Sequence, residues 1–463
     1  MTQTSKVKSK LCEPSRRFAD NVGGLRVALE DSMMAIAHGL RHEDKHFREF
    51  AQKYGEHDES EGKSSWRFPP RYAATAIRLL RHANRLALGA ELVPRSMVVA
   101  LVSQFDVLLS GLMRALAASK PDIITHEDKS VTLDELEVLG SLEAVKAHFL
   151  EKEVESLLRK SHPEQFEWLE KRFSVKLRAF DSWPAFVEIS QRRNLLVHAD
   201  GRVSRQYLEV CKRHGYQLQP DIKEGELLEV PPAYWKASTA IVYEVGVKLS
   251  QVLWRKLLPD EIDQADDELN RIIYELLLHR RFPLAEALSK FAYSLPRHSN
   301  NEARLIMVVN HAIATEWQDR HDDCLRVLAA EDWSACAPKF LLANSVLEGD
   351  FDKAALIMRQ VGASAAMEEA YQEWPLFRRF REDDRFKQAY KSVFTRDFEN
   401  VTQDLQDMHR KALRKMLDEV ASQLPTPAAS PVACAEMVAS EQPLEAAQQG
   451  AAADDRPQAG DRG

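Results

Sequence analysis

Apolar residues recur at helical spacing along most of this chain, and this periodicity constrains its fold more than any other feature. In "SLEAVKAHFLEKEVESLLRKS" and "SWPAFVEISQRRNLLVHA" the apolar positions fall mainly three or four residues apart, as on one face of a helix. The two stripes are formed by Leu142, Val145, Phe149, Val154, Leu157 and Leu158, and by Phe186, Val187, Ile189, Leu196 and Val197. No section is convincingly rich in strands, so we predict an all-α protein around a bundle of about four or five helices.

The most apolar segment, residues 97–118, has the length of a membrane span but contains Gln104, Asp106 and Arg114. Charges in the middle of a bilayer are costly, whereas a helix in a soluble protein can turn them outward. We therefore expect a long core helix here and no membrane association.

The chain divides into five parts by composition, and its 463 residues suit two or three domains. Residues 1–65 are polar and end in "GEHDESEGKSS", which predicts a flexible region. The long helical segments occupy residues 66–260, and shorter helical units follow over 265–398. Residues 399–423 suggest one more helix, and the Ala-, Pro- and Gln-rich stretch 424–463 is expected to be a disordered tail.

Net charge, cysteine spacing and the motifs that are missing from the sequence argue against several classes of protein. A net charge of −8 excludes a generic nucleic-acid coat, so any nucleic-acid contact must be a local patch. The cysteines are scattered and form no CxxC pair, which favours a reducing compartment and argues against a zinc finger. The N-terminal stretch has no apolar signal region and no phosphate-binding glycine motif is present, so we expect a cytoplasmic protein without a nucleotide cofactor.

The stretch "QRRNLLVHADG", residues 191–201, carries the strongest chemical signal. On a helix Asn194 and His198 share a face, and Arg193 lies about 140° round the axis from His198. A histidine can move the proton of a ribose 2′-OH, and a guanidinium can hold the phosphate and its growing charge. The three residues therefore suit metal-independent cleavage of RNA, with Asn194 orienting the imidazole or the phosphate.

Basic residues cluster around this motif in an otherwise acidic chain. The candidates for RNA binding are Arg192, Arg202, Arg205, Lys212 and Arg213. Such a cluster fits an RNA groove, although a solvated helix face has the same composition.

The motif "RRNLLVH" at the end of a helical segment, followed by "ADG", resembles the R-x4-6-H signature of HEPN domains over roughly residues 90–258. Arg193 and His198 match the two defining positions, and Asn194 matches the frequent polar residue after the arginine. The resemblance implies a metal-independent ribonuclease of toxin–antitoxin, phage-defence or CRISPR type. It also implies a homodimer, because two motifs generally face one cleft and this chain has one good copy.

The chain departs from one subgroup of the family. Members paired with nucleotidyltransferase antitoxins often have a tyrosine two residues after the histidine, where this chain has Asp200, so regulation by modification of that tyrosine is not expected. A second interpretation of the motif also stays open. Some HEPN proteins are non-catalytic interaction scaffolds, in which Arg193 would pair with a nearby carboxylate.

A different motif, "HEDKH" at residues 42–46, fits the H-E-x-x-H pattern of zinc proteases. His42 and His46 would bind the metal, and Glu43 would act as the general base. The polar Asp44 and Lys45 between them argue for an exposed charged helix, so no metal is expected here.

Residues 265–398 resemble tetratricopeptide-like repeats. "LLANSVLEGDFDKAALIMRQVG" has a small apolar helix, a Gly-Asp-aromatic turn and a second helix, and "ELLLHRRFPLAEALSKFA" repeats the turn and helix. Phe282 and Ala285 then correspond to Phe351 and Ala354, and "EWQDRHDDCLRVLAAEDW" is a degenerate middle copy. The resemblance implies a short α-solenoid of two or three helical hairpins, a module that binds peptides or a protein partner, dimerises or packs on a neighbouring domain. A plain helical C-terminal domain is the alternative.

Overall fold

Helices account for nearly all regular structure in the computed structural model, which describes residues 8–58, 65–120, 132–219 and 222–399. The strands within these ranges are β1 (Glu56–Asp58) and β2 (Ser65–Arg67), which pair antiparallel with His57 opposite Trp66. The predicted all-α class is therefore confirmed. The predictions for 399–423 and 424–463 lie outside the described residues, apart from residue 399.

The chain forms two compact units. Of the described residues, the first unit comprises 8–38 together with 86–399, and the second comprises those between Gly39 and Arg85. Helices α1 (Cys12–Tyr54) and α2 (Pro70–Ser119) each contribute residues to both units.

Residues 12–54 differ from the expected flexible N-terminal region, because they form the 43-residue helix α1. Phe18, Val22 and Leu29 lie one or two helical turns apart and are buried, so one face of α1 belongs to the core. The second half of this helix is mostly polar, so the apolar stripe in its first half did not by itself predict a helix of this length.

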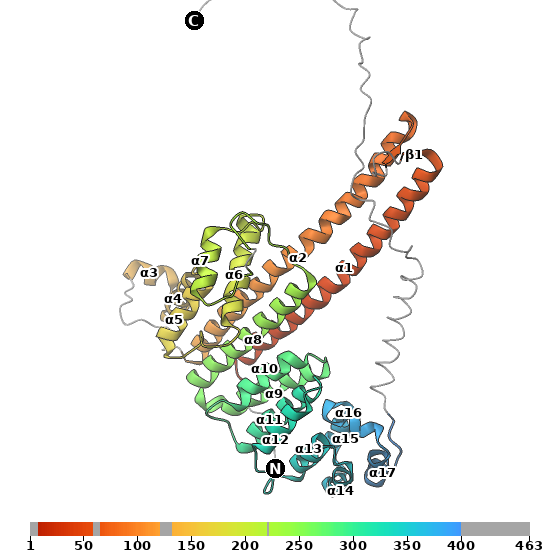
Figure 1. Cartoon of the computed structure of the whole chain (residues 1–463). Coiled ribbons are helices and arrows are strands. Elements are labelled where there is room, and N and C mark those ends of the chain that lie inside the picture. The colour runs from red at the N-terminus through yellow and green to blue at the C-terminus, as the bar shows by residue number, and fades with distance from the viewer. Residues whose placement is uncertain (1–7, 59–64, 121–131, 220–221, 400–463) are drawn as a thin grey trace, which may run out of the picture. The chain divides into compact units, whose positions relative to one another are not determined.

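The first unit contains a helical bundle whose bounds differ from the predicted 66–260, because residues 66–85 belong to the second unit and α1 contributes to the core of the first. Its helices after α2 are α3 (Leu133–Leu139), α4 (Leu142–Leu158), α5 (His162–Phe173), α6 (Trp183–His198), α7 (Arg205–Arg213) and α8 (Pro232–Leu257). Figure 1 shows α6 beside α7, and both belong to this unit. Phe105 of α2, Phe166 of α5 and Phe186 of α6 meet with ring centroids 4.7–5.9 Å apart. These rings fix the three helices against one another.

The predicted core helix over 97–118 is the second half of α2, where Leu101, Leu108 and Leu112 are fully buried. Among the described helices, α2 alone is long and apolar enough to cross a membrane, by length and composition, and half of its most apolar window is buried inside the protein.

Close approach of α1, α2 and α8 depends on Gly246 of α8. A Cβ atom at this position would lie 2.5 Å from Cζ of Phe18 and 3.0 Å from Cδ2 of Leu108. Only glycine therefore permits the observed packing of α8 against α1 and α2.

Shorter helices follow from residue 262 and pair in series (Figure 1). They are α9 (Ile262–Leu278), α10 (Phe282–Tyr293), α11 (Asn301–Glu316), α12 (His321–Ala329), α13 (Pro338–Glu348), α14 (Phe351–Val361), α15 (Ala365–Glu373), α16 (Arg378–Glu382) and α17 (Asp384–Phe394). The short 3₁₀ turns Pro259–Glu261 and Pro375–Phe377 precede α9 and α16. Helix α11 packs on both α9 and α13, so the first helices of successive pairs adjoin.

The residue correspondence between the helical pairs holds in three dimensions. Phe282 and Phe351 each begin the second helix of a pair, and Ala285 and Ala354 are fully buried three positions later. In the middle pair, α12 begins at His321 and the residue three positions on, Cys324, is also fully buried. The second helix of each pair thus places a small, fully buried side chain three positions after its first residue.

The bundle joins the helical pairs through Asp266 of α9. Its carboxylate accepts a hydrogen bond from Arg255 of α8 at 2.6 Å and one from the Ser299 N–H at 2.7 Å, and His298 Nδ1 lies at 3.2 Å. Burial acts to raise the pKa of this carboxyl, but the contacts with His298, Ser299 and Arg255 outweigh it and hold the pKa well below its usual range.

We predict that Gly246→Ala destabilises the protein by about 1–3 kcal/mol, because the added methyl overpacks the contact with Phe18. Gly89→Ala is the matched control: Gly89 lies in α2 with nothing within 4 Å of an added Cβ, so alanine should stabilise that helix slightly. Thermal unfolding followed by circular dichroism compares the two. Equal melting temperatures for the two variants would contradict the close-packing argument.

We also predict that Asp266 contributes to acid sensitivity. A carboxyl with a depressed folded-state pKa contributes stability above its unfolded pKa of about 3.9, and this contribution is lost as the pH falls further. Urea unfolding between about pH 3 and pH 7 should show a shallower acid loss in Asp266→Asn, with lower stability at neutral pH. An unchanged slope would show that the carboxyl does not titrate with unfolding.

Candidate functional site

Helix α6 carries the motif and ends where the sequence predicted. Phe186, Val187 and Ile189 anchor its first half in the core, and His198 is its last residue. Asp200 and Gly201 then adopt positive φ angles of 48° and 77°, which aspartate and glycine tolerate best.

The turn after α6 is tied down from two directions. The Gly201 N–H donates to the Leu195 carbonyl at 3.0 Å, and the Leu228 N–H donates to the Gly201 carbonyl at 2.9 Å. Asp200 accepts a hydrogen bond from Arg95 of α2 at 2.9 Å. The end of α6 therefore has a fixed position relative to α2.

Arg193 lies against Asp106 of α2 without a close hydrogen bond to it. Its terminal nitrogen is 3.9 Å from Asp106 Oδ2, and its side chain is 26% exposed. Its Nε is buried and has no hydrogen-bond partner among the described residues. The guanidinium is thus held in place by charge while keeping donor capacity for an incoming anion.

The sequence analysis missed His162, the first residue of α5. Its Nε2 lies 3.2 Å from Asp106 Oδ1 without hydrogen-bond geometry, and its ring centroid is 5.6 Å from those of Phe105 and Phe186. Asp106 thus lies between Arg193 and a buried histidine. No local pattern around "HPEQF" signals this, because α2, α5 and α6 meet only in the tertiary structure.

His198 is exposed, and Asn194, one turn earlier, is half-buried. Their spacing puts both side chains on one face of α6, as predicted. The neighbouring Val197 is 50% exposed, so the end of α6 offers an apolar contact beside the imidazole.

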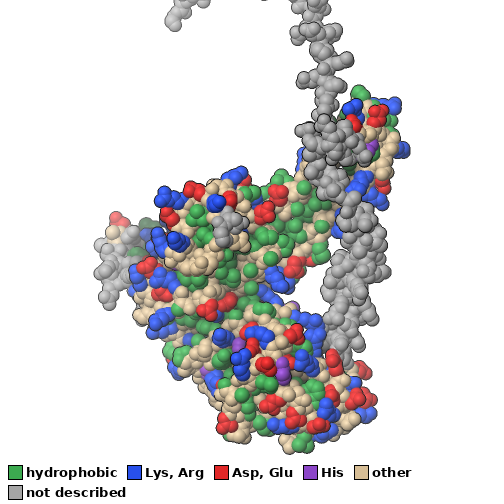
Figure 2. Space-filling model, viewed as in Figure 1, with side chains coloured by type: hydrophobic (Ala, Val, Ile, Leu, Met, Phe, Trp, Pro, Cys, Tyr) green, Lys and Arg blue, Asp and Glu red, His purple; other side chains and the backbone are tan. Residues whose placement is uncertain are grey.

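Four of the five predicted RNA-binding residues are exposed. Arg202 and Arg205 follow the end of α6, whereas Lys212 and Arg213 lie at the other end of α7, where His214 packs on Trp183 at the start of α6. Arg202 lies in the turn, and Arg205, Lys212 and Arg213 lie on α7, whose opposite face buries Tyr207 and Cys211. Figure 2 shows Lys and Arg side chains interspersed with a few acidic ones on the face over this region. Two are already engaged: Arg202 donates to the Gly225 carbonyl, and Arg205 pairs with Glu209 at 2.9 Å.

Arg192 departs from the predicted RNA-binding set, because it is buried. It donates to Glu188 Oε1 at 2.7 Å and to the Glu229 carbonyl at 2.8 Å, and its guanidinium lies 3.9 Å from the Tyr234 ring centre. Glu188 also accepts from the hydroxyls of Tyr207 at 2.8 Å and Tyr234 at 2.9 Å. We call Glu188, Arg192, Tyr207 and Tyr234 the Glu188 network; it is an internal structural element.

The Glu188 network shifts the pKa values of its own members and of the nearby Cys211. Burial and then the negative charge of Glu188 raise the pKa values of Tyr207 and Tyr234 well above 10. The same two causes raise the pKa of the Cys211 thiol to about 12, so it stays protonated and unreactive. Burial acts to lower the pKa of Arg192, but the tyrosines and Glu188 raise it overall.

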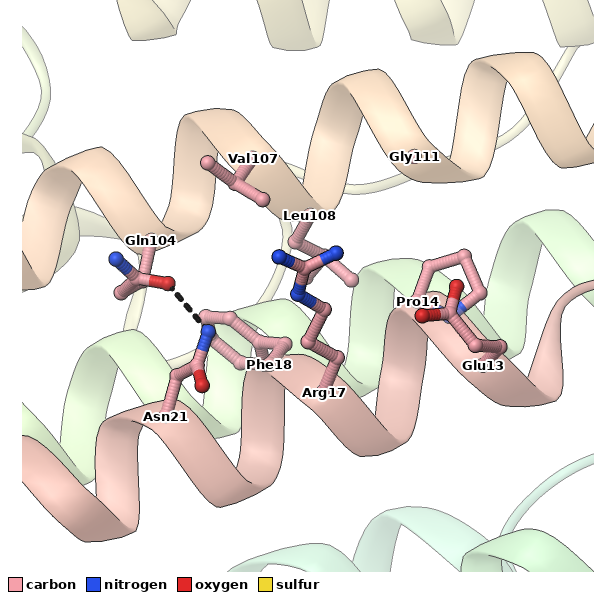
Figure 3. A pocket seen from close by; sticks show the side chains of 9 residues that line it. All are labelled: Glu13, Pro14, Arg17, Phe18, Asn21, Gln104, Val107, Leu108 and Gly111. Carbon is pink, nitrogen blue, oxygen red and sulfur yellow. Dashed lines mark hydrogen bonds between the residues drawn. The ribbon is translucent and has the colours of Figure 1, made fainter.

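Two other features of the structure share no residues with the motif. A pocket lies between α1 and α2 in the first unit, where Asn21 donates to Gln104 at 2.8 Å beside Arg17 (Figure 3). None of its lining residues is a predicted site residue. In the second unit, His42, Glu43 and His46 place potential metal-ligand atoms within 4.8 Å of one another.

Comparisons with known proteins leave the chain without a match: no family model, no curated protein and no solved structure matches it. The interpretation of the motif therefore depends on its residues and geometry.

We predict that Arg192→Met destabilises the protein by about 3–5 kcal/mol, because it leaves Glu188 as an uncompensated buried charge. Arg205→Met is the matched control: Arg205 and Glu209 are also an i,i+4 pair at a similar distance, but the arginine side chain is 81% exposed, so little change is expected. Denaturant unfolding measures both. Equal losses would contradict the assignment of Arg192 to the core.

Proposed function

We propose that this protein is a metal-independent endoribonuclease of the HEPN type. One observation carries the proposal: α6 ends in an exposed His198, while Arg193 on the same helix is held by Asp106 without a close hydrogen bond. Two exposed cations, Arg202 in the following turn and Arg205 at the start of α7, follow them in the chain and provide contacts for the RNA backbone.

The chemistry follows from these residue types. His198 takes the proton of the ribose 2′-OH, and O2′ attacks the adjacent phosphorus. The bond from phosphorus to O5′ breaks, a proton passes to O5′, and the products carry a 2′,3′-cyclic phosphate and a 5′-OH. Arg193 binds the non-bridging oxygens as their charge grows, and Asn194 orients the imidazole or the phosphate. The nucleophile belongs to RNA, so no metal is required.

Exposed apolar residues support the proposed homodimer. Val197 is 50% exposed and precedes His198, and Leu227 is 44% exposed and reaches toward Gly201. Apolar side chains grouped around a polar site favour protein association over solvent exposure. In a twofold dimer, the second copy would supply the histidine that protonates O5′.

We assign the helical pairs α9–α14 a tetratricopeptide-like role in binding a protein partner that controls cleavage. The repeated small buried residues Ala285, Cys324 and Ala354 support this kinship. A cytoplasmic toxin or phage-defence enzyme is the setting that this combination suits best.

One observation favours a second candidate, a non-catalytic interaction scaffold. Asp106 is close enough to Arg193 for a charge interaction between α2 and α6, so the arginine has a structural role available to it. In that case the motif would stabilise the bundle and its dimer.

We predict that the purified protein cleaves end-labelled RNA in EDTA and leaves a cyclic phosphate identified by mass spectrometry. His198→Ala and Arg193→Ala should each lower the rate by about 100-fold or more. His148→Ala, an exposed histidine on α4, is the control and should cleave like the wild type.

No cleavage of several RNAs by the wild type, even with lysate added as a source of activator, would favour the scaffold. Cleavage that survives in His198→Ala would remove the motif from the mechanism.

A further inference from the structure

The second unit has too small an apolar core to explain its compactness. Among its described residues only Ala51 and Ala76 are buried apolar side chains. Its aromatic residues, including Phe50, Phe68 and Tyr72, contact one another but stay partly exposed. Small units with so little buried apolar area usually need a disulfide or a metal.

Potential metal ligands gather in this unit on the two helices. His42 and His46 lie one turn apart on α1, with ring centroids 4.0 Å apart. Glu43 Oε1 is 3.8 Å from His42 Nδ1, and the ligand atoms of these three residues all lie within 4.8 Å.

A fourth ligand comes from the other helix. His82 of α2 places its Nε2 4.0 Å from the same Glu43 Oε1. The Glu43 carboxylate, with its side chain 17% exposed, thus faces one imidazole from each helix. Of the charges between the two histidines, Asp44 pairs with Arg48 and Lys45 with Glu49.

We propose that His42, Glu43, His46 and His82 bind one divalent transition-metal ion of the zinc class, which joins α1 to α2 within the second unit. Three imidazole nitrogens and one carboxylate oxygen suit Zn²⁺, Co²⁺ or Ni²⁺, whereas Mg²⁺ and Ca²⁺ prefer all-oxygen sites. Bonds of about 2.0–2.1 Å in a tetrahedron separate ligand atoms by about 3.3 Å. The ligand atoms of His42, Glu43 and His46 lie within 4.8 Å of one another and His82 Nε2 lies 4.0 Å from Glu43 Oε1, so side-chain rotation has to bring all four atoms to that separation when the metal binds.

The ligand count distinguishes this site from a zinc protease. In a protease of the H-E-x-x-H type the glutamate stays off the metal and acts as a base, and a water fills an open position. Here Glu43 lies between the two helices and completes four protein ligands with His82. A closed site of this kind stabilises structure, and it is separate from the proposed cleavage of RNA in EDTA.

The test begins with the full-length protein after treatment with a chelator, which is titrated with Zn²⁺ and followed by calorimetry. A second titration with Co²⁺ is followed by absorption spectroscopy, because a tetrahedral Co²⁺ site has characteristic visible bands. We expect one ion per chain. The double variant His42→Ala/His46→Ala should abolish this binding, and His82→Ala or Glu43→Gln should weaken it by about tenfold or more. His148→Ala is the matched control and should bind as the wild type does.

Hydrogen exchange gives a second readout that does not depend on affinity. At saturating Zn²⁺, exchange should slow at amides around residues 40–50 of α1 and 75–85 of α2 in the wild type and in His148→Ala, but not in the double variant His42→Ala/His46→Ala. Circular dichroism confirms that the variants keep their helices. Wild-type binding no tighter than that of the double variant would overturn the site, and unchanged binding by His82→Ala would overturn the link between the helices.

Discussion

The buried carboxylate of Glu188 sets the arrangement of the helices around the candidate site. It accepts hydrogen bonds from Arg192 on its own helix, from Tyr207 of α7 and from Tyr234 of α8. A charge removed from water is tolerated only when its lone pairs are satisfied, so the three helices have to meet at this point. The network therefore fixes the rotation of α6, on which the orientation of the motif depends.

That rotation decides which of the adjacent arginines can act on a ligand. Successive residues on a helix point about 100° apart, so turning Arg192 inward places Arg193 toward α2 and the surface. Asp106 then meets Arg193, while the aromatic contacts of Phe105 and Phe186 hold α2 and α6 together. The same geometry brings His198 to the exposed end of α6. The proposed nuclease and the scaffold share this architecture and differ in whether an RNA phosphate engages the guanidinium.

The two units differ in the interactions that can stabilise them. The first has an extensive apolar core with large buried side chains such as Trp254 and Phe166. The second has little buried apolar surface, and its helices bring histidines and a carboxylate together instead. A bound metal would supply the free energy of folding that hydrophobic burial does not.

The sequence by itself determined what depends on neighbouring residues. Apolar periodicity predicted the helices and the all-α class, Asp200–Gly201 predicted the end of α6, and the positions of Phe282 and Phe351 predicted equivalent helix starts. These features follow from backbone preferences and from spacing within one or two helical turns.

Only the tertiary structure decided which polar groups meet. It turned Arg192 into the core, placed Asp106 between Arg193 and His162, and brought His82 to Glu43. It also showed that the polar N-terminal part is a long helix, because the stripe that includes Phe18 has its partners on α2 and α8. Contacts between residues distant in the sequence depend on how helices pack, and a helical pattern shows which face is apolar but not which partner will cover it.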